Sequence, residues 1–142
     1  MSDAMALVTV DAAGAAAAQV LGGLGAAFHS AGLPVVHVVD TKAAGEAVVA
    51  GAALDVELLE NGGVQTLGPA EMAMALATGG AFDATPLDAL LRGLGVDTVV
   101  VAGHLRSPRV SASVRAAELR GYHVLLATDE LAVALGAHLR AA

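Results

Sequence analysis

Short runs of valine and leucine alternate along the chain with segments that carry helix signals, and this alternation constrains the fold most. Five such runs are predicted as strands: Met5–Val10, Pro34–Val39, Glu71–Leu76, Asp97–Ala102 and Tyr122–Ala127. Because most of these runs are apolar throughout rather than at every second residue, we expect both faces of the strands to be buried. Strands of this kind, separated by helices, predict a parallel, Rossmann-like sheet in a three-layer α/β/α fold.

The segments between the strands carry signals for helix starts and stops. Helices are expected over Ala13–Ala31, from Thr85-Pro86 onward, from Ser107-Pro108 to Arg120, and from Thr128 to Arg140. Proline is favoured at the first helical position, and a glycine such as Gly121 favours the end of a helix. The stretch 41–70 shows no clear pattern, and Gly62-Gly63 favours a loop there.

A chain of 142 residues predicts one domain, here residues 1–142. Seven Lys+Arg against fourteen Asp+Glu give a net charge of −7. A negative chain repels phosphate, so we expect neither nucleic acid nor a membrane surface as a partner. The first residues lack the basic region of a signal peptide, which makes the cytoplasm the expected compartment.

The chain contains no cysteine, which excludes disulfides, thiolate metal sites and a cysteine nucleophile. Hydrophobic residues make up 56% of the chain, while aromatic residues make up only 2%. Covering so much apolar surface in a small domain favours a partner subunit, since large exposed apolar patches mark interfaces. We therefore expect a homodimer or homotetramer.

Ligands of open α/β sheets bind outside the carboxyl ends of the strands. This rule selects the polar positions that follow the predicted strands. They are Asp11, Asp40, the segment 76–81, the loop 103–109, and Thr128 with Asp129.

The segment 95–132 resembles the isochorismatase-like, or cysteine hydrolase, superfamily. The positions that match the family pattern are Gly95, Asp97, Thr98, Gly103, Val110, Arg115, Ala117, Gly121 and Tyr122. ALVTVD (6–11) is similar to the opening strand of the family, whose last residue is the catalytic aspartate. Ala81-Phe82 resembles a further family element, and we assign Phe82 to substrate binding.

The sequence departs from the family pattern at its reacting groups. The resemblance places Arg109 at the nucleophilic cysteine and Leu76 at the catalytic lysine, so Asp11 alone remains of the triad. Lys42 stands where the nicotinamidase branch has a metal-binding histidine, and we expect neither a metal nor another cofactor. Amide hydrolysis through a thiolate is then impossible, because an arginine stays protonated and is no nucleophile.

The resemblance also implies a chemistry that needs no cysteine. True isochorismatases use an aspartate as a general acid that protonates a vinyl ether, so that water can add. Asp11 could act in this way, because burial raises the pKa of a carboxyl group. The alternative for Asp11 is a helix cap, which a position after a strand also favours.

Three further candidates lie in the loop 103–109. Arg106 and Arg109 beside a helix start favour a carboxylate or phosphate ligand, although Pro108 removes one N–H donor. The alternative is structural pairing with Asp11, Asp40 or a neighbouring subunit. His104 is the best histidine for acid/base work, with an exposed loop histidine as the alternative.

Two classes of function remain open from the sequence. One is a cysteine-independent enzyme acting on a small organic, anionic metabolite, with Asp11 and His104 as catalytic residues and Arg106, Arg109, Asp40 and Phe82 as binding residues. The other is a catalytically inactive pseudoenzyme that serves as a ligand-binding or oligomeric module. His37, inside the second predicted strand, is interpreted as a hydrogen-bonded core histidine.

Overall fold

The computed structural model describes residues 5–10, 27–28, 30–39, 48–49, 52–53, 55–61, 63–68, 71–75, 87–103 and 108–126. Within helix and strand segments, a few side chains lie outside this description, among them those of Val39, Val56 and Arg109. Structural statements below refer to this part of the chain.

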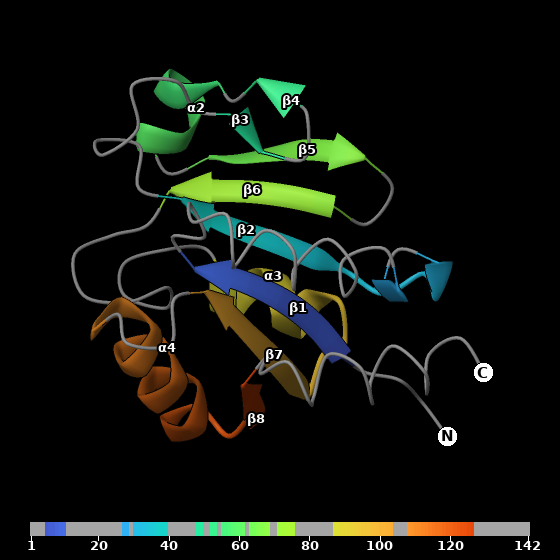
Figure 1. Ribbon diagram of the computed structural model, residues 1–142, viewed down its shortest axis with the longest axis vertical. Helices are drawn as coiled ribbons and strands as arrows, with labels where there is room; N and C mark the ends of the chain where they lie inside the picture. The colour runs from blue at the N-terminus through green and yellow to red at the C-terminus, as the bar shows by residue number, and fades with distance from the viewer. Residues whose placement is uncertain are drawn as a thin grey trace.

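A six-stranded sheet forms the centre of the molecule (Figure 1). Its strand order is β5-β6-β2-β1-β7-β8. The strands are β1 (Met5–Val10), β2 (Val35–Val39), β5 (Val64–Gly68), β6 (Glu71–Ala75), β7 (Thr98–Gly103) and β8 (His123–Leu126). The pairs β6-β2, β2-β1, β1-β7 and β7-β8 are parallel, while β5 runs antiparallel to β6.

The central strands are buried on both faces, as their apolar sequences predict. In β1, every residue from Ala6 to Val10 is buried, and β7 buries Val99 to Ala102. A strand buried on both faces needs cover on both sides, and helical segments supply it.

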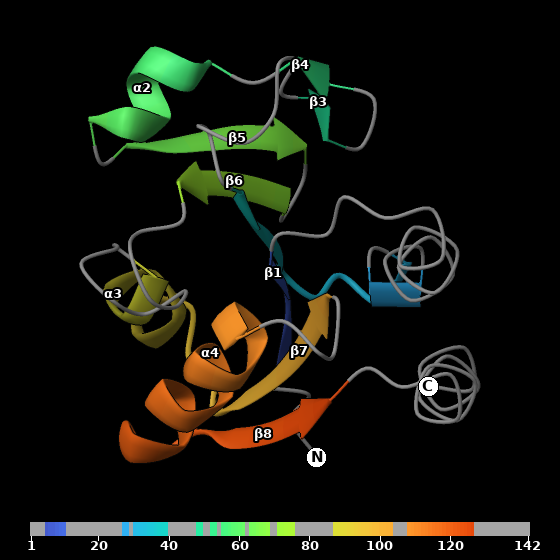
Figure 2. The same ribbon diagram turned by 60° about the vertical axis from the view of Figure 1, so that its left-hand side comes forward.

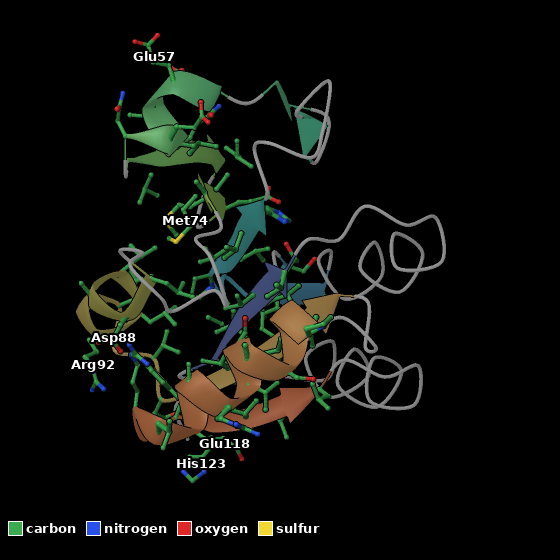
Figure 3. All side chains as sticks on the ribbon, turned by 90° about the vertical axis from the view of Figure 1, so that its left-hand side faces the viewer. Glu57, Met74, Asp88, Arg92, Glu118 and His123 are labelled. Atoms are coloured by element: carbon green, nitrogen blue, oxygen red, sulfur yellow. The ribbon has the colours of Figure 1, made fainter. Side chains whose placement is uncertain are left out.

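Helices α3 (Leu87–Gly93) and α4 (Pro108–Leu119) cover one face of the sheet (Figure 2). Leu87 and Leu91 of α3 join the same buried cluster as Val110 of α4 and Met74 of β6, which Figure 3 labels. The residues covering the opposite face include Ala27 and Phe28, which are helical and pack with Leu7, Leu33, Val35, Val100 and Ala102. These two clusters confirm the expected three layers.

Smaller elements lie beside the β5 edge of the sheet. Helix α2 (Val56–Glu60) begins after Asp55, whose side chain accepts a hydrogen bond from the Leu58 N–H. Strands β3 (Val48–Val49) and β4 (Ala52–Ala53) form a separate antiparallel pair. The described residues contain no helix long and apolar enough to cross a membrane.

The predicted parallel sheet of about five strands is confirmed, and a sixth strand that the sequence did not predict extends it at one edge. The sixth strand, β5, lies in the stretch that the sequence left without a pattern, and it is antiparallel. Its sequence, VQTLG, carries only two large apolar residues, so pairing with β6 rather than local periodicity makes it a strand.

Other boundaries shift by a residue or lie outside the described chain. Strand β7 begins one residue later than predicted, and α4 ends one residue before the predicted Arg120. Gly121 follows with a φ of 90°, a left-handed conformation that glycine adopts without strain. The helix predicted from Thr128, and most of Ala13–Ala31, lie outside the described residues.

Candidate functional site

The carboxyl ends of three neighbouring strands meet at one edge of the sheet. Val10, the last residue of β1, pairs with Gly103, the last residue of β7, and on its other side with Val38 of β2. Asp11 and His104 are therefore the residues that directly follow a pair of neighbouring strand ends. Ligands of open α/β sheets bind at this edge, and the sheet brings Val10 and Gly103, the residues before the predicted catalytic pair, to it.

Helix α4 begins beside the same edge. Its first residue is Pro108, so the backbone of Arg109 occupies the second helical position. Val110 of α4 is buried in the cluster that also holds Val99 and Val101 of β7, which fixes the start of the helix against the sheet. A helix N-terminus attracts anions through its free N–H groups and its dipole.

The predicted site side chains themselves lie outside the described residues. This applies to Asp11, Asp40, Phe82, His104 and Arg106, and to the side chain of Arg109. The structure places the strands that end just before Asp11, Asp40 and His104, and the helix whose backbone includes Arg109. Contacts among the six side chains stay predictions.

One polar chain crosses three strands of the sheet, from Thr9 near the carboxyl end of β1 to Glu71 at the start of β6. The Thr9 hydroxyl and His37 Nδ1 are 2.9 Å apart, and His37 Nε2 lies 2.8 Å from Glu71 Oε2. These residues belong to the neighbouring strands β1, β2 and β6. The exposed fraction is 3% for Thr9, 14% for the His37 side chain and 26% for that of Glu71.

The interpretation of His37 as a hydrogen-bonded core histidine is confirmed. Its two partners could not be found from the sequence, because they depend on strand register. Thr9 pairs directly with His37, while Glu71 stands opposite Val35, two residues earlier in β2. The sequence does show a glutamate, Glu71, at the start of a predicted strand, but this position does not reveal that His37 is its partner.

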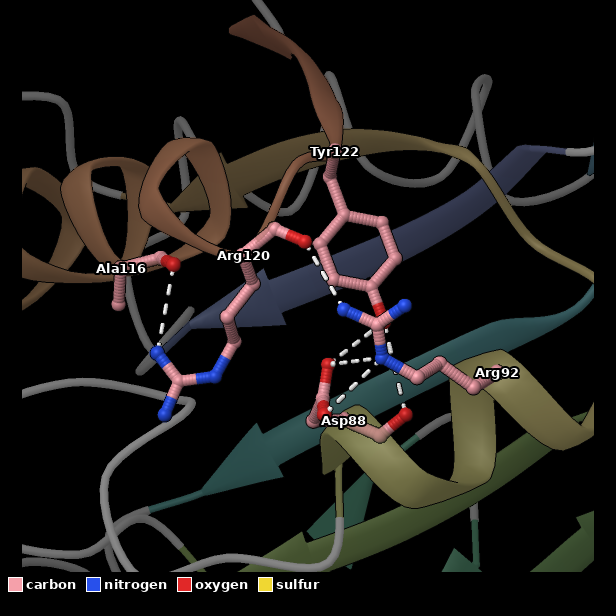
Figure 4. Close-up of polar contacts among 5 residues, drawn as sticks. All are labelled: Asp88, Arg92, Ala116, Arg120 and Tyr122. Carbon is pink, nitrogen blue, oxygen red and sulfur yellow. Dashed lines mark hydrogen bonds and ion pairs between the residues drawn. The ribbon is translucent and has the colours of Figure 1, made fainter.

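A second polar cluster ties α3 to the start of β8 (Figure 4). The Tyr122 hydroxyl donates to Asp88 Oδ1 at 2.8 Å, and Arg92 Nε lies 3.2 Å from both carboxylate oxygens. Arg92 also stacks over the Tyr122 ring, with 5.3 Å to its centroid, and donates to the Arg120 carbonyl.

This cluster shifts the pKa of two of its members. Burial raises the pKa of Tyr122 to about 12, and the hydrogen bond to Asp88 adds to the shift. For Asp88, burial acts to raise the pKa, but hydrogen bonds from Tyr122 and Arg92 outweigh it and lower the pKa below the ordinary value. The cluster joins α3 to β8, and we assign it a structural role.

No group of three His, Asp or Glu side chains in the described part of the chain comes close enough to hold a metal ion. The polar groups that could serve a ligand there are the Thr9–His37–Glu71 chain and the N-terminus of α4.

The molecule is an α/β domain with an open, mostly parallel sheet and helical segments on both faces. The ends of its central strands meet beside the start of a helix, and domains of this architecture bind small molecules at that edge. A family model described as the isochorismatase domain matches residues 7–135. The chain belongs to the isochorismatase family.

Solved structures of this family share the fold. A nicotinamidase from Staphylococcus aureus is 18% identical with a TM-score of 0.66, covering 94% of this chain and 91% of its own. An N-carbamoylsarcosine amidase from Thermoplasma acidophilum is 23% identical with a TM-score of 0.63, covering 88% and 82%. An isochorismatase family protein from Burkholderia thailandensis is 22% identical with a TM-score of 0.63, covering 91% and 79%. No curated protein matches the chain.

Proposed function

We propose that this protein is a cysteine-independent enzyme that acts on a small anionic metabolite by acid/base chemistry centred on Asp11. The observation that carries the proposal is the pairing of Val10 with Gly103, which brings the chain positions before Asp11 and His104 to one edge of the sheet. Asp11 is the general acid, and His104 assists the transfer of protons.

The anion is held at the start of α4. Arg109 is the second residue of that helix, and Arg106 precedes the helix by two residues. Guanidinium groups bind carboxylates and phosphates through paired hydrogen bonds, and a helix start adds N–H donors. Asp40, which follows the end of β2, and Phe82 complete the binding residues.

The absence of cysteine separates this chemistry from that named for the two amidases. A chain without cysteine cannot form an acyl-thiolate intermediate. A general acid that protonates a substrate carbon or oxygen needs no nucleophile from the protein, because water completes the reaction. The family fold therefore supports acid-catalysed addition of water to a substrate such as a vinyl ether.

A second candidate is a pseudoenzyme that binds a ligand without converting it. The absence of the family's catalytic cysteine and lysine favours this candidate, because Asp11 alone remains of the triad that the resemblance implies. Both candidates would act in the cytoplasm as a homodimer or homotetramer on a small-molecule ligand.

A thermal-shift screen of small carboxylates and phosphates tests the anion site. A ligand at about 100 times its dissociation constant stabilises the fold by roughly 2.7 kcal/mol, or several degrees in a domain of this size. We expect such shifts in the wild type and none in Arg106→Ala/Arg109→Ala. Arg115→Ala, an exposed arginine further along α4, is the matched control and should shift like the wild type.

Equal shifts in the wild type and in the double variant would contradict the anion clamp. Shifts that depend on the arginines, without turnover of any bound compound, would favour the pseudoenzyme.

A further inference from the structure

Strand β8 forms an open edge of the sheet. In the described part of the chain it pairs with β7 alone, and Figure 2 shows it at one end of the sheet, with α2 beyond the other end. The exposed fraction is 37% for Leu125 and 42% for Leu126, although both are large apolar residues. An exposed apolar edge presents unpaired backbone groups to which a further strand can bind.

The other edge of the sheet carries features that prevent such pairing. The register of β5 with β6 is irregular between Thr66 and Gly68, and the Gln65 side chain accepts a hydrogen bond from the Asp55 N–H at 2.6 Å. Helix α2 also contacts β5. Strand β8, with the sequence HVLL, has no charged residue, no proline and a regular register with β7. Proteins normally protect an edge strand by such features, so the unprotected β8 indicates a partner.

The two exposed leucines lie on opposite faces of the sheet. Leu126 pairs with Val101, which belongs to the buried cluster under α3 and α4, whereas Leu125 pairs with Val100 of the cluster on the other face. A helix laid on the sheet would cover only one of these faces. A strand added beside β8 continues both faces and covers both leucines. The occupant that fits this edge is therefore a strand.

The hydrogen bonds of β8 show which of its backbone groups point outward. The His123 N–H donates to the carbonyl of Asp97, the residue before β7, at 2.9 Å. Successive residues of a strand direct their backbone groups to opposite sides, so His123 and Leu125 face β7. Val124 and Leu126 therefore present their N–H and C=O groups to the open edge.

We propose that β8 pairs with β8 of a second copy of this chain in antiparallel orientation, which joins the two sheets into one. The two-fold axis passes at Leu125, so Val124 of each copy stands opposite Leu126 of the other. Each of these pairs exchanges two hydrogen bonds through the outward backbone groups. This inference goes beyond the proposed function, because it names the surface of the oligomer and does not depend on the chemistry of Asp11.

Strand β8 is complementary to itself in this register. Leu125 stands opposite its own copy on one face, and leucine stands opposite valine on the other, so apolar side chains meet on both faces. A two-fold axis at Val124 would instead place Leu125 opposite the polar His123. Two copies related by a two-fold axis form a closed dimer, the commonest assembly of soluble proteins.

The distribution of charge favours a second copy at this edge. Each copy carries a net charge of −7, so two copies repel each other unless they meet at a neutral surface. Strand β8 carries no Asp, Glu, Lys or Arg, and the exposed charges of the adjoining α4 include both signs, in Arg115 and Glu118. Asp55, Glu57 and Glu60 are exposed beyond the other edge of the sheet.

The width of the sheet separates these acidic residues from the proposed interface. Five strand spacings of about 4.8 Å lie between β8 and β5, roughly 24 Å in all, while the screening length at physiological salt is about 8 Å. Pairing at β8 keeps the acidic α2 helices of the two copies far apart. Pairing at β5 would bring them together.

Single-cysteine variants test the register, because the chain contains no cysteine. Opposite residues of a non-hydrogen-bonded antiparallel pair have Cα atoms about 4.5 Å apart, a distance that a disulfide spans. We expect Leu125→Cys to form a disulfide-linked dimer under mild oxidation. Leu126→Cys is the matched control, because its two copies stand on a diagonal, roughly 8 Å apart, and should not cross-link. Equal cross-linking of the two variants, or none in Leu125→Cys, would overturn the proposal.

The mass in solution tests the interface without cross-linking. We expect Leu125→Lys to halve the mass that light scattering gives for the wild type at micromolar concentration, because it sets two ammonium groups opposite each other. Leu58→Lys on α2, where the leucine is 39% exposed, is the matched control and should keep the wild-type mass. A wild-type mass of 13.9 kDa, or an unchanged mass in folded Leu125→Lys, would overturn the proposal. Leu125→Ser replaces Leu125→Lys if the latter does not fold.

Hydrogen exchange separates the second copy from other occupants of the edge. We expect slow exchange of the Val124 and Leu126 amides in the wild type and fast exchange in monomeric Leu125→Lys. Slow exchange in a monomer would show that the chain after residue 126 covers the edge, and it would overturn the proposal. These measurements are independent of turnover by Asp11→Asn, so failure of the interface and failure of the proposed function are distinguishable.

Discussion

Tyr122 shows how a single side chain sets both the packing and the pH response of this fold. It is buried, donates to Asp88 on α3 and lies under the guanidinium of Arg92. Its hydroxyl therefore holds the start of β8 against a helix on the same face of the sheet. Burial, together with the hydrogen bond to Asp88, raises the pKa of Tyr122, while hydrogen bonds from Tyr122 and Arg92 lower the pKa of Asp88.

We predict that stability falls between about pH 10 and 12 as Tyr122 ionises. Its folded pKa of about 12 exceeds the ordinary value of 10.0, so the folded state holds the proton more tightly and the contribution is complete below pH 10. Tyr122 is the sole tyrosine, so ultraviolet absorbance of the phenolate follows it directly. Half-titration near pH 10 would contradict the burial of Tyr122 together with its hydrogen bond to Asp88. Tyr122→Phe should flatten the fall in unfolding free energy over this range.

The sequence predicts that a residue is hydrogen-bonded where its chemical type and its burial require it. It does not predict the partners where these depend on strand register. That a histidine inside an apolar strand is hydrogen-bonded follows from the cost of burying an unpaired imidazole. That its partners are Thr9 and Glu71 depends on how three strands align, which the sequence of one strand does not contain. The six predicted site side chains lie outside the described residues, and their roles stay predictions.

Elements with strong local signals form where the sequence predicts them. Strand β1 has the predicted bounds, Met5–Val10, because a run of apolar residues ends at a charged one. Helix α4 begins at the predicted proline and ends before Gly121. Strand β5 was missed, because its weak apolar pattern becomes a strand only through pairing with β6.

Two glycines at the ends of short helices should respond oppositely to alanine. A methyl group on Gly63 would lie 2.9 Å from the Leu58 carbonyl oxygen, which also accepts the Gly63 N–H at 3.0 Å. Gly93, the last residue of α3, has nothing within 4 Å of such a methyl group. We expect Gly63→Ala to lower the unfolding free energy by about 1–3 kcal/mol, through crowding of the α2–β5 turn.

Gly93→Ala should raise the unfolding free energy by about 0.5–1 kcal/mol, because it reduces the freedom of the unfolded chain. Urea unfolding of both variants beside the wild type measures the difference. If both variants lost the same amount of unfolding free energy, the free space around Gly93 would not explain the effect of alanine there.

At the scale of the whole molecule, the sheet divides into a covered centre and open ends. Strands β1, β2 and β7 are buried, whereas the edge strand β8 leaves Leu125 and Leu126 exposed. Leu119, the last residue of α4, is 81% exposed. Figure 3 shows the acidic α2, with Glu57 labelled, at the far end of the molecule from Asp88 and His123.

We predict that these exposed leucines are covered by a second copy of the chain, giving a homodimer or homotetramer. Light scattering on a sizing column should return two or four times the chain mass of 13.9 kDa. Leu119→Ser tests the surface at little cost to the core, since this side chain is mostly in solvent. A wild-type mass of 13.9 kDa at micromolar concentration would contradict the prediction.

The central claim is that this member of the isochorismatase family acts through an acid rather than a thiolate. The most direct measurement is hydrolysis of a vinyl-ether carboxylate by the wild type and by Asp11→Asn, with circular dichroism to show that both fold. We predict turnover by the wild type and a loss of at least about 100-fold in Asp11→Asn, the usual contribution of a general acid. Turnover that survives Asp11→Asn unchanged would contradict the claim.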